Sequence, residues 1–264
     1  MKTLIEDIIS LLKEKYEKRN IPKIKEVFIG LGYTSVKVSD GVMGICFTPR
    51  TEANDCCCSY FDKPGTLWQK DIFSFVDMGK SKNPLERAVG IAAINALSQI
   101  IFREEEYRLN TKDDVLDLIP LSKSDRVVMV GNIGPFIDYI KGNSKILTVI
   151  DNNPALQGKQ EGYVVVDDLN VLKEADISII TGASMIYDTV DQVLGLAQSS
   201  RHITMVGPTV GCLPEPLFER NVENVAGMRV TDVDKVRHII FEGGGTRQFS
   251  PYTEKFVFQK SLMI

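Results

Sequence analysis

The chain has 264 residues, of which 44% are hydrophobic and 25% are charged, and its formal net charge is −4. Such a chain can bury a substantial core and is long enough for two modest domains, as in a soluble enzyme. The charge gives no general attraction to nucleic acid, no segment approaches the roughly 20 apolar residues that span a bilayer, and five cysteines, three of them adjacent, make a poor disulfide framework. We therefore expect a cytoplasmic protein that binds neither nucleic acid nor membrane.

The N-terminal part predicts a helix followed by a small antiparallel sheet. Residues 3–19 carry apolar side chains at helical spacing, with lysines and glutamates between them. Extended runs follow at 25–29, 35–38 and 42–47, and Asp40-Gly41 between the last two is typical of a hairpin. We interpret these three runs as an antiparallel meander.

A second helix is predicted to begin after Asn83 and to reach Phe102. Asparagine is a favoured N-cap, Pro84 would take the first helical position, and Glu86 follows the cap by three residues. Its small residues indicate close packing against a neighbouring element; they are Ala88, Gly90, Ala92, Ala93 and Ala96.

From residue 126 the pattern changes to alternating strands and helices. The predicted strands are 126–130, 145–150, 163–166, 177–180, 202–206 and 224–230, and the predicted helices lie near 135–141, 189–198 and 233–241. This alternation predicts a doubly wound parallel sheet covered on both faces, within an α/β protein of two domains, 1–110 and 111–264. Ligands of such sheets bind beyond the carboxyl ends of the strands, at the switch in strand order.

The loop after the first of these strands is the most informative one. It reads Gly131-Asn132-Ile133-Gly134-Pro135, and Asp151 follows Gly131 by 20 residues, at the tip of the next strand. A Rossmann-type sheet holds a nucleoside-bearing ligand in this way. The third glycine of the dinucleotide fingerprint is absent, so NAD is disfavoured, whereas a nucleoside such as S-adenosylmethionine is compatible. Two alternatives stay open: the glycines serve turn geometry alone, or Asp151 caps the helix after Pro154.

Two further loops carry polar groups at predicted strand tips. Thr181-Gly182-Ala183-Ser184 and Gly207-Pro208 offer hydroxyls and backbone donors that suit a carboxylate, a phosphate or a ribose. The predicted cofactor-binding residues are therefore Gly131, Asn132, Gly134, Asp151, Thr181, Gly182, Ser184, Gly207 and Pro208.

Motifs in both halves resemble known families. They are Ile29-Gly30-Leu31-Gly32-Tyr33-Thr34-Ser35-Val36, Gly44 to Thr48, Asn83 to Ala96, Val130-Gly131, Ala175 to Ser184 and Val206-Gly207-Pro208. The chain resembles DUF4213 in its first half and DUF364 in its second, families described as "putative heavy-metal chelation" proteins. The resemblance implies an enolase N-terminal-like α+β domain, a Rossmann-like domain similar to methyltransferases, and an active site shared between them. Several relatives carry Asn-Gly where this chain has Tyr187-Asp188.

Four residues of the N-terminal motifs are candidates for catalysis: Tyr33, Thr34, Glu86 and Arg87. A hydroxyl of the glycine-flanked Tyr33-Thr34 turn would face the domain interface, although a hairpin role alone is equally open. Glu86 is also explained as the capping-box partner of Asn83. Arg87 is freer to meet an anionic substrate, because its planar fork matches carboxylate or phosphate geometry.

A direct metal site has weaker support in the sequence. Cys56-Cys57-Cys58 could bind a soft cation, with Cys46 or Cys212 as distant additions, but adjacent side chains point in different directions and structural zinc sites use spaced pairs. His202 and His238 are expected to be structural, in a buried strand and in a helix.

Two classes of function follow from these observations. The first is an enzyme, a transferase or hydrolase, that acts on a small heteroaromatic or chelator-like molecule by condensation, hydrolysis or group transfer in a cleft between the domains. The second is a non-catalytic protein that binds a metal or a metal complex. A homodimer is expected on general grounds, since symmetric pairing is common.

Overall fold

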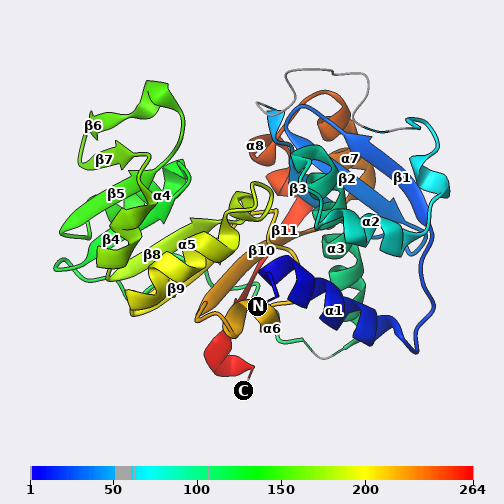
Figure 1. The fold of residues 1–264 in the computed structure, drawn as a ribbon, viewed down its shortest axis with the longest axis horizontal. Coiled ribbons are helices and arrows are strands. Elements are labelled where there is room, and N and C mark those ends of the chain that lie inside the picture. The colour runs from blue at the N-terminus through cyan, green and yellow to red at the C-terminus, as the bar shows by residue number, and fades with distance from the viewer. Residues whose placement is uncertain (1, 51–60, 62, 106, 264) are drawn as a thin grey trace.

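The first half of the chain forms one small sheet with helices around it. A computed structural model describes residues 2–50, 61, 63–105 and 107–263. Its N-terminal elements are α1 (Leu4–Tyr16), β1 (Ile24–Ile29), β2 (Tyr33–Val38), β3 (Met43–Phe47), the short 3-10 helix η2 (Leu67–Gln69), α2 (Ile72–Met78) and α3 (Pro84–Glu104) (Figure 1). The three strands pair antiparallel in the order β1-β2-β3, so the predicted meander is confirmed.

The long helix α3 packs closely on this sheet. A Cβ atom added at Gly44 of β3 would lie 2.0 Å from the carbonyl oxygen of Ala92 and 2.3 Å from the amide nitrogen of Ala96. Strand and helix therefore approach more closely than any side chain at this position would allow. The prediction that the small residues of this helix mark close packing is confirmed.

The second half forms a large, mostly parallel sheet, as predicted. Its order is β11-β10-β9-β8-β4-β5-β7-β6, and the central six strands are parallel. The strands are β4 (Arg126–Val130), β5 (Ile146–Ile150), β6 (Gly158–Gln160), β7 (Tyr163–Val166), β8 (Ile177–Thr181), β9 (His202–Val206), β10 (Asn224–Val230) and β11 (Thr253–Gln259). Two antiparallel edge strands that the sequence reading missed, β6 and β11, flank the parallel strands.

The order in which the chain adds parallel strands to the sheet reverses at β4. From β4 the chain adds β5 and β7 on one side, then returns to add β8, β9 and β10 on the other. This order occurs in doubly wound nucleotide-binding sheets, where the ligand crevice lies at the switch point. The switch point here is between β4 and β8. The specific likenesses to Rossmann-type and enolase N-terminal domains stay predictions.

Helices cover both faces of the large sheet. They are α4 (Gly134–Ile140), α5 (Val190–Leu196), α6 (Glu215–Phe218), α7 (Val233–Phe241) and α8 (Thr246–Phe249), with short 3-10 helices, η3 (Pro154–Leu156), η4 (Leu169–Glu174), η5 (Gly182–Met185), η6 (Ala197–Ser199), η7 (Ser250–Tyr252) and η8 (Lys260–Leu262), between them. Val127 and Met129 of β4 are buried in the cluster that contains α4, whereas Val128 is buried in the cluster that contains α5. Successive strand residues point to opposite faces, so a doubly covered strand is apolar throughout.

The last helices return to the N-terminal sheet. Val236 and Ile240 of α7 and Phe249 of α8 share a buried cluster with Met43 and Ile45 of β3, while the other face of that sheet packs on α3. The small sheet is thus enclosed between an N-terminal helix and C-terminal helices (Figure 1). The domain boundary near residue 110 stays a prediction.

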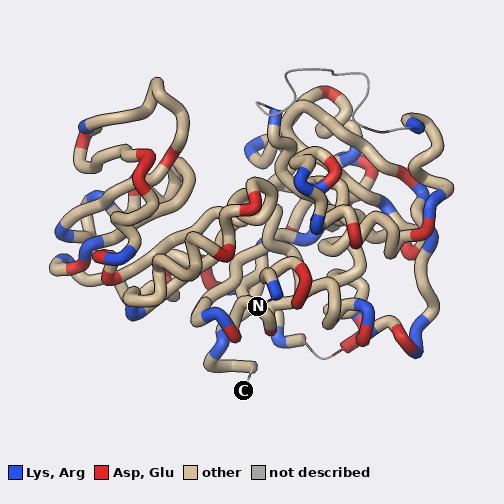
Figure 2. The backbone as a smooth tube through the Cα atoms, viewed as in Figure 1, with Lys and Arg blue, Asp and Glu red and all other residues tan. Residues whose placement is uncertain are grey.

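Charged residues are spread along the chain, and its longest apolar helix is buried. Figure 2 shows positive and negative residues interspersed along both halves of the chain. Within the described residues, α3 is the one helix that is long and apolar enough to cross a membrane, but 89% of its most apolar window is buried inside the fold. We therefore assign α3 to the protein core.

Candidate functional site

The loops after β4 and β8 meet at the switch point. The amide of Gly131 donates to the carbonyl of Ile150 at 2.8 Å, and the residue has a φ of 90°, in the left-handed region. An added Cβ at Gly131 would lie 2.8 Å from Cγ2 of Thr181. Both the backbone conformation and the contact with Thr181 therefore require glycine here.

Asp151 organises the carboxyl ends of β4 and β5. Its Oδ2 accepts from the amide of Asn132 at 3.3 Å and its Oδ1 accepts from the amide of Asn153 at 2.9 Å. Asn153, not Asp151, caps the short helix after Pro154, through a bond from the amide of Ala155 at 3.0 Å. The alternative that Asp151 is this N-cap is therefore wrong. Each carboxylate oxygen has a second lone pair with which to accept a ligand hydroxyl.

Gly134 differs from Gly131. It begins α4, has no positive φ, and an added Cβ would meet no atom within 4 Å. Its side of the loop is exposed, as is the side chain of Asn132. Nothing in the local geometry requires glycine at position 134.

The segment after β8 uses most of its polar groups internally. The hydroxyl of Thr181 accepts from the amide of Ala183 at 3.3 Å, and the buried hydroxyl of Ser184 donates to the carbonyl of Thr181 at 2.9 Å. Gly182 is buried against Val210. Ser184 and Gly182 thus shape the turn, and Thr181 is the residue of this segment that borders Gly131.

The N-terminal half covers the loop after β9. Gly207 has a φ of 119° and donates its amide to the carbonyl of Ala226 at 2.9 Å, and the partly exposed Pro208 follows it. Thr209, which the sequence reading did not select, accepts from the amide of Phe47 through its hydroxyl at 3.1 Å and from Asn95 Nδ2 through its carbonyl at 2.9 Å. This loop therefore joins the halves. The signal that could have identified Thr209 was its position directly after the predicted residues Gly207 and Pro208.

Arg87 reaches from the start of α3 to the segment after β8. Its residue is 4% exposed, its Nε donates to the carbonyl of Ser81 at 2.8 Å, and its Nη1 lies 2.6 Å from Oδ1 of Asp188. Arg87 thus pairs with the Tyr187-Asp188 turn.

Glu86 has a different partner from the predicted one. Asn83 caps α3, as expected, by accepting from the amides of Leu85 and Glu86. The carboxylate of Glu86 does not return to Asn83 but accepts from the hydroxyl of Ser81 at 2.6 Å. The predicted capping box is therefore wrong, because the amide of Asn83 donates to Ser81 Oγ instead, at 3.1 Å.

Tyr33 and Thr34 are held within other contacts. The hydroxyl of Tyr33 lies 2.5 Å from that of Thr246 in α8, and burial raises the pKa of Tyr33. Thr34 is completely buried and its hydroxyl lies 3.0 Å from that of Thr48. Within the described residues, neither forms a hydrogen bond with the loops after β4, β5 or β8.

The described residues contain no group of three or more metal-ligating side chains. Cys46 and Cys212 are both buried; burial raises the pKa of Cys46 far above its ordinary value and raises that of Cys212 to about 12. Thiols in this state are poor ligands for a soft cation, because the thiolate is the binding form. Cys56, Cys57 and Cys58 lie outside the described residues.

The molecule is therefore an α/β protein whose mostly parallel sheet presents a glycine loop and a carboxylate at its switch point. A buried arginine from the other half pairs with the segment that follows β8. The chain belongs to the DUF364 family, whose model, described as "Putative heavy-metal chelation", matches residues 114–259. The DUF4213 model, with the same description, matches residues 12–98.

Similar proteins cover nearly the whole chain. An uncharacterised protein of Methanocaldococcus jannaschii is 27% identical over 266 residues, which cover 97% of this chain and 98% of that protein. The crystal structure of a DUF364 protein of unknown function from Pyrococcus horikoshii superimposes with a TM-score of 0.81 at 26% identity, over 97% of this chain and 100% of that one. A DUF364 structure from Desulfitobacterium hafniense gives a TM-score of 0.74 at 19% identity, over 97% and 98% of the two chains, and supports the fold alone.

Proposed function

We propose that the protein is an enzyme that binds a nucleoside-bearing small molecule at the switch point between β4 and β8, and that it makes or modifies a heteroaromatic or chelator-like compound. The family description connects the chain with heavy-metal chelation. Production or modification of a chelator is compatible with this description and needs no cluster of metal ligands. The reaction class we favour is group transfer, with condensation or hydrolysis as alternatives.

The observation that carries the proposal is the carboxylate of Asp151 beside Gly131. Asp151 holds the amide of Asn132 while keeping acceptor capacity, and so can receive the hydroxyls of a ribose. Gly131 has no side chain where the loops after β4 and β8 meet, so Thr181 packs directly against its backbone and the two loops stay close together beside this carboxylate. A third loop glycine is absent, which favours a mononucleoside over NAD.

Isothermal titration calorimetry with adenosine, S-adenosylmethionine and NAD tests this proposal. We expect adenosine and S-adenosylmethionine to bind more tightly than NAD, and Asp151→Asn to weaken both by about tenfold, because one charge-assisted acceptor is lost. Gly131→Ala should also weaken both.

Two matched variants separate binding from stability. Asp71→Asn changes a carboxylate that likewise accepts a backbone amide, but at the start of α2, and Gly142→Ala adds a methyl group at an exposed turn after α4 where space is open. Neither should alter nucleoside affinity. Absence of adenosine binding, together with zinc or copper retained by the purified protein in native mass spectrometry, would show that the protein is a metal binder and overturn the proposal.

A further inference from the structure

We propose that Arg87 is the anion-binding group for a carboxylate-bearing ligand, and that Asp188 is an internal carboxylate that occupies Arg87 until the ligand displaces it. The inference rests on the proposed nucleoside site and specifies its ligand further. It assigns a role to the Tyr187-Asp188 turn. Asp188 acts here as a built-in competitor of the ligand.

The two partners of this ion pair differ strongly in exposure. The side chain of Arg87 is 5% exposed and that of Asp188 is 64% exposed, with 2.6 Å between Nη1 and Oδ1. An exposed carboxylate regains most of its hydration when it leaves, whereas a buried guanidinium left without an anion is strongly unfavourable. Exchange of Asp188 for another carboxylate keeps the buried charge of Arg87 paired at every stage.

Asp188 adopts a backbone conformation that favours its release. Its φ of 59° lies in the left-handed region, which among the described non-glycine residues is shared only by Asn221. Left-handed backbone costs free energy for a residue with a Cβ, although aspartate tolerates it better than most. The pair with Arg87 offsets this strain, and departure of Asp188 relieves it.

Arg87 itself is held in place independently of Asp188. Its Nε donates to the carbonyl of Ser81, and the hydroxyl of Ser81 both donates to Glu86 and accepts from the amide of Asn83. The guanidinium is thus oriented by the turn before α3 and stays in position when its carboxylate partner changes. The first turn of this long helix adds a favourable potential for an anion.

One segment connects this cation with the switch point. Residues 182–189 begin directly after Thr181, which borders Gly131, and they end with the turn that carries Asp188. A ligand that contacts both ends of this segment needs a nucleoside for Gly131 and Asp151 and a carboxylate on a flexible arm for Arg87. S-Adenosylmethionine has both parts, whereas adenosine lacks the whole methionine arm, so the pair isolates the contribution of that arm and the variants of Arg87 and Asp188 assign the part due to its carboxylate.

Calorimetric titration of the full chain and three variants tests the exchange. Asp188→Asn should bind S-adenosylmethionine about tenfold more tightly, because the internal competitor is removed and the binding-competent state is populated without ligand. Arg87→Gln should bind it about tenfold more weakly. Adenosine affinity should stay the same in wild type and both variants. Asp114→Asn, which changes an exposed ion-paired carboxylate elsewhere, should change neither affinity.

The outcomes distinguish this inference from the function on which it depends. Adenosine binding that responds to Asp151→Asn, combined with S-adenosylmethionine affinity unchanged in Asp188→Asn, overturns the exchange but leaves the nucleoside site standing. Failure of both ligands to bind overturns both. Should Arg87→Gln not fold, as seen in its circular dichroism, the comparison of Asp188→Asn with Asp114→Asn decides alone.

Discussion

His202 is placed where the neutral imidazole is favoured. The side chain is buried at the start of β9, and its Nε2 lies 3.0 Å from the hydroxyl of Thr204 and 3.2 Å from Nδ2 of Asn224. Burial lowers the pKa of His202 from its ordinary value of 6.5; nearby Glu223 opposes this shift and Arg201 adds to it. The folded protein therefore takes up a proton at this site less readily than the unfolded chain does.

This difference predicts a stability that falls on acidification. The free energy of unfolding should be unaffected by His202 above the ordinary pKa of 6.5 and should decrease as the pH falls through the lower folded pKa, because only the unfolded chain protonates readily. Urea denaturation from about pH 7.5 to about pH 5 should show a smaller decrease in His202→Gln than in wild type. His238→Gln, at an exposed site on α7, should behave like wild type; an equal effect of both variants would contradict the assignment.

At the scale of single residues, local signals were predictable and distant partners were not. Gly131 and Asp151 were selected because a strand, a loop and a strand tip follow one another in the sequence. The pairing of Arg87 with Asp188, and the bonds to Thr209, join segments far apart in the chain. No spacing rule reaches such partners, since they depend on how the two sheets are placed.

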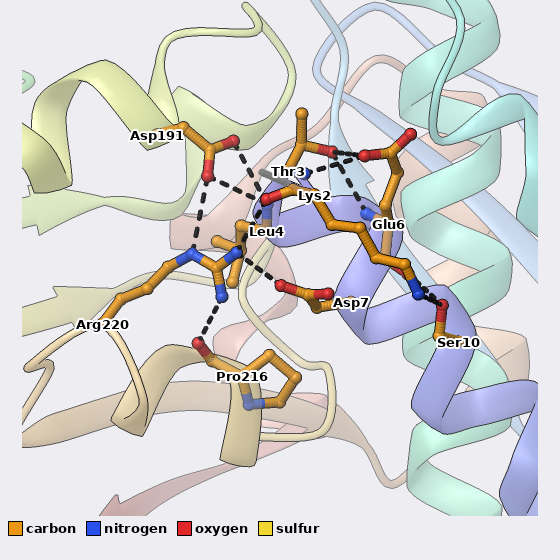
Figure 3. Close-up of polar contacts among 9 residues, drawn as sticks. All are labelled: Lys2, Thr3, Leu4, Glu6, Asp7, Ser10, Asp191, Pro216 and Arg220. Atoms are coloured by element: carbon orange, nitrogen blue, oxygen red, sulfur yellow. Dashed lines mark hydrogen bonds and ion pairs between the residues drawn. The ribbon is translucent and has the colours of Figure 1, made fainter.

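One arginine connects α1 with α5 and α6, two of the helices that cover the large sheet. Arg220, just after α6, lies 2.6 Å from Asp7 of α1 and 3.5 Å from Asp191 of α5, and it donates to the carbonyl of Pro216 at 2.9 Å. Asp191 also accepts from the amide of Leu4 at 2.9 Å, as Figure 3 shows. Thr3 and Glu6 cap α1 from within, while the amide of Leu4 and the carboxylate of Asp7 are bonded to side chains from the other half.

Removal of this arginine should loosen α1. Arg220→Met should lower the free energy of unfolding by about 1 to 3 kcal/mol, because the carboxylates of Asp7 and Asp191 and the carbonyls of Pro216 and Lys2 lose a charged donor. It should also speed amide hydrogen exchange in residues 4–16. Arg126→Met removes an arginine whose ion pair with Glu174 is far more exposed, and should cost at most about 1 kcal/mol. Similar losses in the two variants would show that Arg220 has no special role.

Whole elements were predictable where their apolar pattern was continuous. The ranges of β4, β7, β9, β10 and α7 were predicted to the residue. The edge strand β6 consists of three exposed residues and has no apolar pattern; only its pairing with β7 makes it a strand. The alternation in β11 was visible in Phe256 and Phe258, but its antiparallel direction depends on β10.

Across the whole molecule, the two halves share one buried core. Asn95 in the middle of α3 is completely buried, and its Nδ2 donates to the carbonyls of Ile45 and Thr209, each at 2.9 Å. These acceptors belong to β3 and to the loop after β9. A single amide therefore bridges the small sheet and the large one.

Loss of this bridge should weaken the whole fold. Asn95→Ala leaves two buried carbonyls without a donor and should lower the free energy of unfolding by about 2 to 4 kcal/mol. Ser98→Ala, one turn later, removes a buried hydroxyl that has no hydrogen-bond partner, and should change stability by less than about 1 kcal/mol. Chemical denaturation of both variants measures the contrast, and a larger loss for Ser98→Ala would refute this account.

The enclosure of the small sheet by α7 and α8 has a consequence for biosynthesis. During translation, Tyr33, Met43 and Ile45 leave the ribosome long before Val236, Ile240 and Phe249, which cover them in the finished protein. The nascent N-terminal half must therefore keep one apolar face open until the last helices are made. Completion of the first part of this protein depends on the arrival of its last part.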